Sequence, residues 1–544
     1  MDVRRIPTEP FEDQRPGTAG LRKKVRRFQQ PHYLENFLQA VFDAAGDFRG
    51  RALVAGGDGR YWNAEALAVL FRVAAGNGVR RMIVGRGGML STPAASHLIR
   101  SREAAGGFLL TASHNPGGPD GDFGVKFDTA NGGQAPESLT DAVWRRSLEL
   151  REYRLADIGP LDLDRPGIQQ AGPMEVEIVD PVADYAALME RLFDFDRIHS
   201  LLAGPGFRLR FDALNAVTGP YAVEILERRL GAPPGSVVNA VPLPDFGGLH
   251  PDPNPVDAAH LVDWMNGPDA GDLAAASDGD GDRNMIVGRG MVVSPGDSLA
   301  VLAEHAGKVP GYAAGLAGVA RSMPTTRAVD RVAAALGIPC YETPTGWRYF
   351  CNLLDAGLID LCGEESFGTS SSHAREKDGL WAVLFWLNLV AVTGRPVTHL
   401  VEDHWRRFGR HAFCRHDWFI PDGEAAARVM AGLEERLPAL AGQAIAGTRV
   451  TAADSFTYLD PVDGSASAGQ GIRIFLEDGA RLVYRLSGTG TEGATLRIYL
   501  ERYLAPDADH DGEGPALTAG LGRAAGALAR IAELAGVHEP AGII

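Results

Sequence analysis

Three successive parts of the chain repeat one order of strand-like and helix-like segments. In the first part, the apolar runs "RALVAG" (51–56) and "GFLLT" (107–111) read as buried strands, and "NAEALAVLFRVAA" (63–75) has helical periodicity. The same alternation recurs from about residue 208 and again from about residue 315. Alternating strands and helices favour parallel sheets with right-handed crossovers. We therefore expect an α/β fold in which three parts share a β-α-β-α-β core, each a mixed sheet between helices.

The last part of the chain departs from this pattern. Residues 471–501 read as antiparallel strands joined by Asp-Gly and Gly-rich turns, and residues 516–536 read as a closing helix. A chain of 544 residues is too long for one hydrophobic core. We therefore expect four domains. They are α/β domains over 1–187, 188–301 and 302–409, and an α+β domain with an antiparallel sheet over 410–544.

Charge and composition limit the partners of the chain. The formal net charge of -16 would repel a phosphate backbone, so we expect no nucleic-acid partner. The four cysteines form no CxxC pair, which is typical of reduced thiols in a cytosolic protein. The longest apolar run, residues 380–392, is too short to span a bilayer. We therefore expect a cytoplasmic protein with no membrane partner.

Each of the three repeated parts ends its third strand on a polar loop. These loops read "TASHNP", "SDGDGDRN" and "GEESFG". In open α/β sheets, ligands bind at the carboxyl ends of the strands. The sequence therefore predicts that the three strand ends converge on one cleft.

The loop "SDGDGDRNM" places Asp278, Asp280 and Asp282 two residues apart. Three carboxylates this close repel one another, and a hard cation relieves the repulsion. A calcium EF-hand is excluded, because Arg283 stands where glycine is needed and Arg289 stands where the bidentate glutamate belongs. A solvated acidic turn is the alternative. We favour Mg²⁺, which leaves places for phosphate oxygens or water, with Arg283 placed to hold a phosphate.

The loop "TASHNPGGPDGDFGVKFD" presents Ser113 next to His114. An acyl-transfer nucleophile is not supported because the G-x-S-x-G elbow is absent, and a lone Ser-His pair is more often a hydrogen-bonded loop. Together with a three-aspartate loop, phosphoryl transfer is the better hypothesis, since a phosphate on Ser113 would complete a magnesium shell. Lys126 would then neutralise charge or relay a proton, unless it is a solvated side chain. A lysine base would need a lowered pKa.

The stretch "RLSGTGTEG" (485–493) offers hydroxyls and unencumbered backbone N–H groups beside Arg485. This combination suits a phosphate cradle, although Gly/Ser/Thr runs are mostly turns. Arg497 on the following strand either adds charge to the cradle or is simply exposed.

Groups suited to sugar hydroxyls follow the third repeat. Glu364 and Ser366 lie in "GEESFG", and Lys377 lies in "REKDG". Thr345 and Gly346 come just before a helix-like segment, where the hydroxyl of Thr345 is a ligand contact or an N-cap.

Four of these stretches together resemble the α-D-phosphohexomutases, with the greatest similarity to the phosphoglucomutase branch found in eukaryotes and some bacteria. They are "TASHNPGGPDGDFGVKF", "DGDGDRNM", "GEESFGTSSSHAREKDGLWAV" and "RLSGTGTEGATLRIY". Supporting stretches such as "GTAGLRKKV", "DFGGLHPDPNP" and "YETPTGWRYF" extend the likeness nearly from end to end. The resemblance implies four domains around a central cleft.

The resemblance also implies a role for individual residues. Ser113 would carry the phosphate and, with Asp278, Asp280 and Asp282, hold Mg²⁺. His114, Lys126 and Arg22 would join Ser113 as catalytic residues. The implied substrate-binding residues are Arg22, Arg283, Thr345, Gly346, Glu364, Ser366, Lys377, Arg415, Arg485, Ser487, Gly488, Thr489 and Arg497.

The reaction implied is the interconversion of α-D-glucose 1-phosphate and glucose 6-phosphate. It would pass through phosphoserine and glucose 1,6-bisphosphate, which would act as both intermediate and activator. Sugar phosphates would be the partners of a monomer or dimer. Another mutase such as a phosphomannomutase, a sugar-bisphosphate synthase, a hydrolase and a catalytically silent phosphoprotein are the alternatives.

Overall fold

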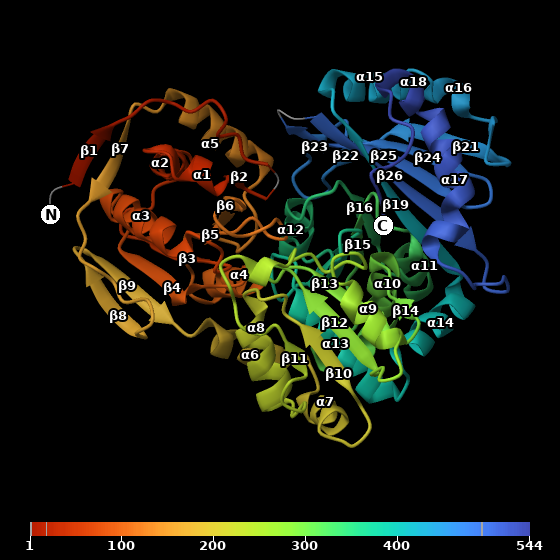
Figure 1. Cartoon of the computed structure of the whole chain (residues 1–544), viewed down its shortest axis with the longest axis horizontal. Coiled ribbons are helices and arrows are strands. Elements are labelled where there is room, and N and C mark those ends of the chain that lie inside the picture. Colours follow the sequence, from red (N-terminus) through yellow and green to blue (C-terminus); the bar gives the residue numbers. More distant parts are fainter. Residues whose placement is uncertain (1–2, 18, 491–492) are drawn as a thin grey trace. The chain divides into compact units, whose positions relative to one another are not determined.

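The computed structural model describes residues 3–17, 19–490 and 493–544. The first repeat forms a seven-stranded mixed sheet (Figure 1). Its strands are β2 (Leu21–Lys24), β3 (Ala52–Gly57), β4 (Arg81–Met89), β5 (Gly106–Leu110), β6 (Asp122–Thr129), β8 (Gly167–Ala171) and β9 (Met174–Val179). The order is β2-β6-β5-β3-β4-β9-β8, with β5, β3, β4 and β9 parallel. Strand β5 is buried throughout and β3 nearly so, which explains their continuous apolar sequences.

Helices pack with this sheet to form the main hydrophobic core of the first repeat. They are α2 (Tyr33–Ala44), α3 (Asn63–Gly76) and α5 (Glu137–Glu149), and α4 (Thr92–Ser101) contacts β3 and β5 outside this core cluster. Helix α4 begins after Ser91, whose Oγ accepts a hydrogen bond from the backbone N–H of Ala94 at 3.3 Å. This N-cap and the proline that follows it fix where the helix starts.

The second repeat forms a five-stranded mixed sheet in the order β11-β10-β12-β13-β14. Its strands are β10 (Leu209–Asp212), β11 (Val237–Val238), β12 (Leu273–Ser277), β13 (Asn284–Gly288) and β14 (Met291–Val292). Strand β11 is only two residues long. In the third repeat, β15 (Val319–Ser322) pairs parallel with β16 (Cys340–Thr343). Strands β17 (Leu361–Glu364) and β18 (Gly368–Ser371) pair antiparallel.

The C-terminal part folds into an antiparallel seven-stranded sheet in the order β20-β21-β24-β25-β26-β19-β27. Its strands are β19 (Arg410–Ile420), β20 (Ala444–Ile445), β21 (Thr448–Ser455), β24 (Ile472–Leu476), β25 (Arg481–Gly490), β26 (Gly493–Leu504) and β27 (Gly542–Ile543). Helices α15 (Gly423–Glu434) and α17 (Gly514–Leu528) pack on this sheet through one core. The expected fold class is confirmed: the first three repeats contain mixed sheets and the last part an antiparallel one.

The chain divides into two compact units. Unit 1 comprises Met1–Val293, His305–Ala317 and Gly346–Thr398. Unit 2 comprises Ser294–Glu304, Gly318–Thr345 and His399–Ile544. The four-domain boundaries given above stay predictions.

Helix α13 (Gly379–Thr393) is buried from Gly379 to Val390, which accounts for the apolar run in the sequence. Within the described ranges, no single helix is long and apolar enough to cross a membrane. Helix α13 and the following α14 (Val397–Phe408) reach that threshold only as a pair, by length and composition, and they are bent by 82°.

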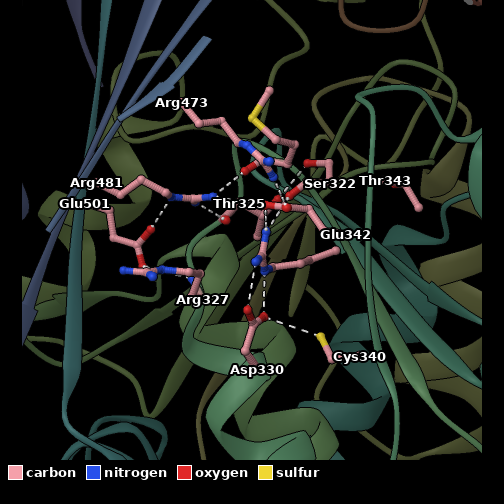
Figure 2. A network of polar contacts seen from close by, with 12 residues as sticks. Ser322, Thr325, Arg327, Asp330, Cys340, Glu342, Thr343, Arg473, Arg481 and Glu501 are labelled. Atoms are coloured by element: carbon pink, nitrogen blue, oxygen red, sulfur yellow. Dashed lines mark hydrogen bonds and ion pairs between the residues drawn. The ribbon is translucent and has the colours of Figure 1, made fainter. Parts of the chain in front are cut away.

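A buried network of charged groups within unit 2 joins β15 and β16 to the C-terminal sheet (Figure 2). Arg481 of β25 is 1% exposed and donates to the backbone carbonyls of Met323 and Thr325 at 2.8 and 2.7 Å. It also pairs with Glu501 of β26 at 2.8 Å and with Glu342 of β16 at 3.2 Å. The network further includes Arg321, Arg327, Asp330 and Arg473. These contacts explain why residues 318–345 belong to the same unit as the C-terminal sheet.

Candidate active site

Ser113 sits on the loop that follows β5 with an unusual backbone conformation. Its φ is 52°, in the left-handed region that non-glycine residues seldom occupy. The backbone N–H of Ser113 donates to Thr111 Oγ1 at 2.7 Å, and the residue is 2% exposed. Such an outlier persists only where the surroundings enforce it, and outliers of this kind cluster at functional sites.

Arg60 is the main support of this loop, and the sequence reasoning missed it. Its guanidinium donates to the backbone carbonyls of Ser113 and Asp122, both at 2.7 Å. Asp58 balances its charge at 2.8 Å, and both side chains are fully buried. The pair follows β3 in "GGDGR", a polar loop after an apolar strand like those that predicted the other site residues. The position of Asp58 and Arg60 after an apolar strand was the feature of the sequence that could have identified them.

The three aspartates of the loop after β12 meet in a small volume. Asp278, Asp280 and Asp282 are buried, and one ligand oxygen from each lies within 4.8 Å of the other two. Ser113 Oγ donates to Asp278 Oδ2 at 2.8 Å. A Cβ on Gly279 would lie 2.4 Å from the backbone oxygen of Ser113, so only glycine permits this approach. The serine and aspartate loops predicted from separate motifs therefore form one site.

The aspartate cluster fits a hard divalent cation. Asp280 Oδ1 and Asp282 Oδ1 are buried oxygens without a hydrogen-bond partner. Burial raises the pKa of Asp278 well above its usual value, and Asp282 and Asp280 add repulsion. Buried oxygens that lack donors and repel one another are what Mg²⁺ coordination satisfies. The residues present therefore suit the magnesium ion implied by the sequence.

Positively charged side chains approach the same aspartates. Lys377 Nζ lies 3.1 Å from Asp282 Oδ2, and Arg283 Nε lies 3.9 Å from Asp282 Oδ1. Burial opposes ionisation of Asp280, yet Lys126, Lys377 and Arg22 together lower its pKa. Anionic carboxylates and cations thus alternate around Ser113, an arrangement suited to a phosphate group with a metal ion.

His114 is held in its neutral form. Its Nδ1 lies 3.8 Å from Asp252 Oδ2, and burial, Arg283 and Arg22 lower its pKa well below the usual value. Asp252 also accepts from Arg283 Nη1 at 3.3 Å. The sequence reasoning did not single out Asp252, although it lies in the quoted stretch "DFGGLHPDPNP".

Glu364 and its neighbours form the part of the site that follows β17. Glu364 is buried and accepts a hydrogen bond from the backbone N–H of Gly346 at 2.8 Å. Ser366 is partly buried on the turn between β17 and β18. Thr345 is not an N-cap, because helix α12 (Arg348–Asp355) begins after Trp347 without a side-chain cap. The Oγ1 of Thr345 is buried without a hydrogen-bond partner.

The remaining predicted residues lie in unit 2, on three adjacent strands of the C-terminal sheet. Arg415 on β19 forms a bidentate pair with Asp417 at 2.9 and 2.8 Å. Arg497 on β26 lies 3.6 Å from Asp417, and its register partner on β25 is Arg485. Two arginines, Arg415 and Arg497, therefore approach Asp417, a residue that the sequence reasoning missed. Ser487 is partly buried on β25, while of Gly488 and Thr489 only the backbone is described.

Sequence comparisons match the chain to known domain families over nearly its whole length. Three domains of "Phosphoglucomutase/phosphomannomutase, alpha/beta/alpha", numbered I, II and III, match residues 13–154, 183–290 and 295–408. "Phosphoglucomutase-1, C-terminal domain" matches residues 410–541.

Full-length relatives give the same picture. A phosphoglucomutase of Rhizobium radiobacter is 55% identical, with 99% of both chains covered. A phosphoglucomutase of Schizosaccharomyces pombe is 47% identical, again with 99% of both chains covered. Among solved structures, the open form of the exocytosis-sensitive phosphoprotein parafusin, a phosphoglucomutase from Paramecium, is 42% identical. It has a TM-score of 0.91 and covers 100% of this chain and 99% of its own.

Proposed function

Because the chain belongs to the phosphoglucomutase/phosphomannomutase family, we propose that it is a phosphoglucomutase. It interconverts α-D-glucose 1-phosphate and glucose 6-phosphate. The observation that carries this proposal is the 2.8 Å contact between Ser113 Oγ and Asp278 Oδ2 inside a buried ring of carboxylates and cations. A serine placed in this way can carry a phosphoryl group next to a metal site.

In the proposed reaction, phosphoserine at Ser113 donates its phosphoryl group to the free hydroxyl of the bound sugar phosphate. The bond from phosphorus to Ser113 Oγ breaks, a bond from phosphorus to the sugar oxygen forms, and the proton that the sugar hydroxyl loses is balanced by the one that Ser113 Oγ gains. The product is glucose 1,6-bisphosphate, which turns end for end. Ser113 then accepts the other phosphate, so the sugar leaves as the isomer and the phosphoserine is restored.

The metal site belongs to the same proposal. Asp278, Asp280 and Asp282 would hold Mg²⁺ together with an oxygen of the phosphate on Ser113. When bound, the ion supplies positive charge that stabilises the transferring phosphoryl group. Arg22, Arg283 and Lys377 place further positive charge around that group, and neutral His114 completes the polar lining.

Each unit contains its own candidate substrate contacts. In unit 1, Glu364 and Ser366 would hold sugar hydroxyls, with Lys377 and Gly346 beside them. In unit 2, the arginine group on the C-terminal sheet would hold the phosphate that is not reacting. Its members are Arg415, Arg485 and Arg497, joined by Ser487, Gly488 and Thr489.

The function is tested by a coupled assay for glucose 6-phosphate, started with glucose 1-phosphate, Mg²⁺ and a trace of glucose 1,6-bisphosphate. We expect turnover of glucose 1-phosphate to exceed that of mannose 1-phosphate. Equal or greater turnover of mannose 1-phosphate would reassign the enzyme as a phosphomannomutase, and phosphate release faster than isomerisation would make it a hydrolase.

The intact mass of the chain before and after treatment with glucose 1,6-bisphosphate reports whether the chain becomes phosphorylated. We expect this phosphorylation to disappear in Ser113→Ala.

Metal removal should affect both activity and stability. After treatment with a chelator we expect turnover to stop and to return with Mg²⁺. At a Mg²⁺ concentration 100 times the dissociation constant, the free energy of unfolding should rise by about 2.7 kcal/mol. Thermal unfolding with and without Mg²⁺ measures this rise, which Asp282→Asn should reduce. Asp263→Asn, on the exposed surface, is the control; equal Mg²⁺ responses in the two variants would contradict the assignment.

We also propose a cytoplasmic location and a monomeric or dimeric state. Relatives are named both as cytoplasmic, in Populus tremula, and as chloroplastic, in Solanum tuberosum. Cell fractionation and light scattering of the purified chain test these two points.

A further inference from the structure

Strand β6 places two ionisable side chains in one buried compartment. Lys126 and Asp128 alternate with Val125 and Phe127, so they share the face of the strand opposite to these core residues. Lys126 is 3% exposed and Asp128 is 0% exposed. A buried ammonium is destabilising unless an opposite charge lies beside it.

Glu376 supplies that opposite charge. Its Oε1 lies 2.6 Å from Lys126 Nζ, and its side chain is completely buried. Gln134 Nε2 donates to Glu376 Oε2 at 3.2 Å and so holds the carboxylate in place. The next residue along the loop, Lys377, pairs with Asp282. Two consecutive side chains of the segment "REKDG" therefore reach a catalytic candidate and a predicted metal ligand.

Asp128, which shares this face of β6 with Lys126, makes no hydrogen bond to the lysine. Both of its carboxylate oxygens are buried without a hydrogen-bond partner, and burial raises its pKa well above the usual value. Burial likewise raises the pKa of Glu376, but Lys126 and Lys377 oppose that rise. The ion pair of this compartment is therefore the one between Lys126 and Glu376, at 2.6 Å.

We propose that Glu376 is a positioning residue that keeps Lys126 protonated beside the aspartate loop, so that Lys126 serves phosphoryl transfer as a fixed cation and not as a general base. This inference rests on the proposed phosphoglucomutase activity. It decides between the two roles, charge neutralisation and proton relay, that the sequence leaves open for Lys126.

The charges that face Lys126 agree with this assignment. Burial, the largest influence, would lower the pKa of Lys126. The neighbouring carboxyl groups together outweigh burial and raise this pKa, Glu376 contributing most, followed by Asp128, Asp280 and Asp282. A lysine base needs the opposite shift. Lys126 is also the strongest of the positive charges that lower the pKa of Asp280. A cation at that position can stabilise the charge on a transferring phosphoryl group.

Two substitutions test the proposal within this compartment. Each replaces a carboxyl group by an amide of nearly the same size. Glu376→Gln removes the carboxylate that pairs with Lys126, whereas Asp128→Asn replaces a carboxyl group whose oxygens have no hydrogen-bond partner. At pH 7 and saturating Mg²⁺, we expect kcat of Glu376→Gln to fall by about 10²-fold, because Lys126 loses the partner that keeps it charged. The alkaline limb of the pH profile should move to lower pH. Asp128→Asn should keep the kcat and pH profile of the unmodified chain. Glu376→Asp, which keeps the charge, should restore the alkaline limb.

A second measurement does not depend on activity. In Glu376→Gln the buried lysine has lost its partner, so its folded-state pKa falls below the value in the unfolded chain. Folding then favours the neutral lysine, and the loss in Tm relative to the unmodified chain should shrink as the pH rises toward about 10. The double variant Lys126→Met/Glu376→Gln has no unpaired charge, so it should regain Tm while staying inactive.

The outcomes separate this inference from the function on which it rests. If the unmodified chain does not isomerise glucose 1-phosphate, the function fails, while the Tm measurements still report whether Glu376 keeps Lys126 charged. If Glu376→Gln is as active as the unmodified chain at pH 7, or more active, Lys126 works as a base and the inference is overturned. Equal losses of activity in Glu376→Gln and Asp128→Asn would likewise overturn it.

Discussion

Ser113→Ala should lower the rate of interconversion by at least about 10³-fold, because loss of a covalent nucleophile removes the route itself and not one of its supports. The variant loses the acceptor of the phosphoryl group, while the carboxylates and cations around it remain. The fold should be retained. Among the residues that the structure describes, the hydroxyl of Ser113 forms its hydrogen bond with Asp278 Oδ2, which is worth about 1 kcal/mol.

The measurement is the coupled assay for glucose 6-phosphate, with the urea midpoint recorded on the same preparations. Ser147→Ala is the matched control, because Ser147 is completely buried in α5 and its Oγ donates to the backbone carbonyl of Trp144 at 2.7 Å. Both variants should unfold near the midpoint of the unmodified chain, and only Ser113→Ala should lose activity. A fully active Ser113→Ala would falsify the assignment of the phosphate-carrying residue.

Much of the unit 1 site was predictable because its chemistry lies in short, contiguous motifs at strand ends. Ser113 and the three aspartates each follow an apolar strand, and the rule that ligands bind at the carboxyl ends of strands placed them together. Their partners in space were not predictable in the same way. Arg60 is 53 residues from Ser113 in the sequence. The residues around Arg60 do not indicate which backbone carbonyl its guanidinium contacts.

Charged residues that turn out to be buried explain the other omissions. Glu376 and Asp417 stand close in sequence to Lys377 and Arg415, which were singled out, but a single sequence does not show that each carboxylate balances one or two cations. Lys126 could be singled out, but the sign of its pKa shift depends on Glu376, a long-range neighbour. Burial and pairing are three-dimensional properties, so the catalytic form of a lysine follows only from the fold.

The fold shows the same division between local and long-range information. Helix and strand periodicity is local, and it predicted the three α/β repeats and the antiparallel C-terminal sheet. It did not predict that residues 318–345 join the C-terminal sheet in one compact unit. The contacts that join these residues to the sheet are made by Arg481, Glu342 and Glu501. These side chains are charged, so a hydrophobic pattern in the sequence does not predict that they are buried.

This buried network in unit 2 carries the last prediction. Arg481→Met should lower the free energy of unfolding by about 3–5 kcal/mol, because removing one partner of a buried ion pair leaves the other uncompensated. Glu501 would lose its 2.8 Å partner, and the backbone carbonyls of Met323 and Thr325 would lose their shared donor. Burial would raise the pKa of Glu501, yet Arg481 and His411 hold it well below the usual value.

Urea unfolding followed by tryptophan fluorescence measures the effect, with Arg449→Met as the control. Arg449 pairs with Glu477 at 2.7 Å, but the two side chains are 61% and 55% exposed, so its loss should change the free energy of unfolding by less than about 1 kcal/mol.

The expected pH dependence of this stability difference follows from the lowered pKa of Glu501. Its stabilising contribution is present above the unfolded-state pKa and is lost as the pH falls toward the folded-state value. The gap between the unmodified chain and Arg481→Met should therefore narrow below about pH 4.3. Equal midpoints for Arg481→Met and Arg449→Met at neutral pH would show that the network does not hold residues 318–345 to the C-terminal sheet.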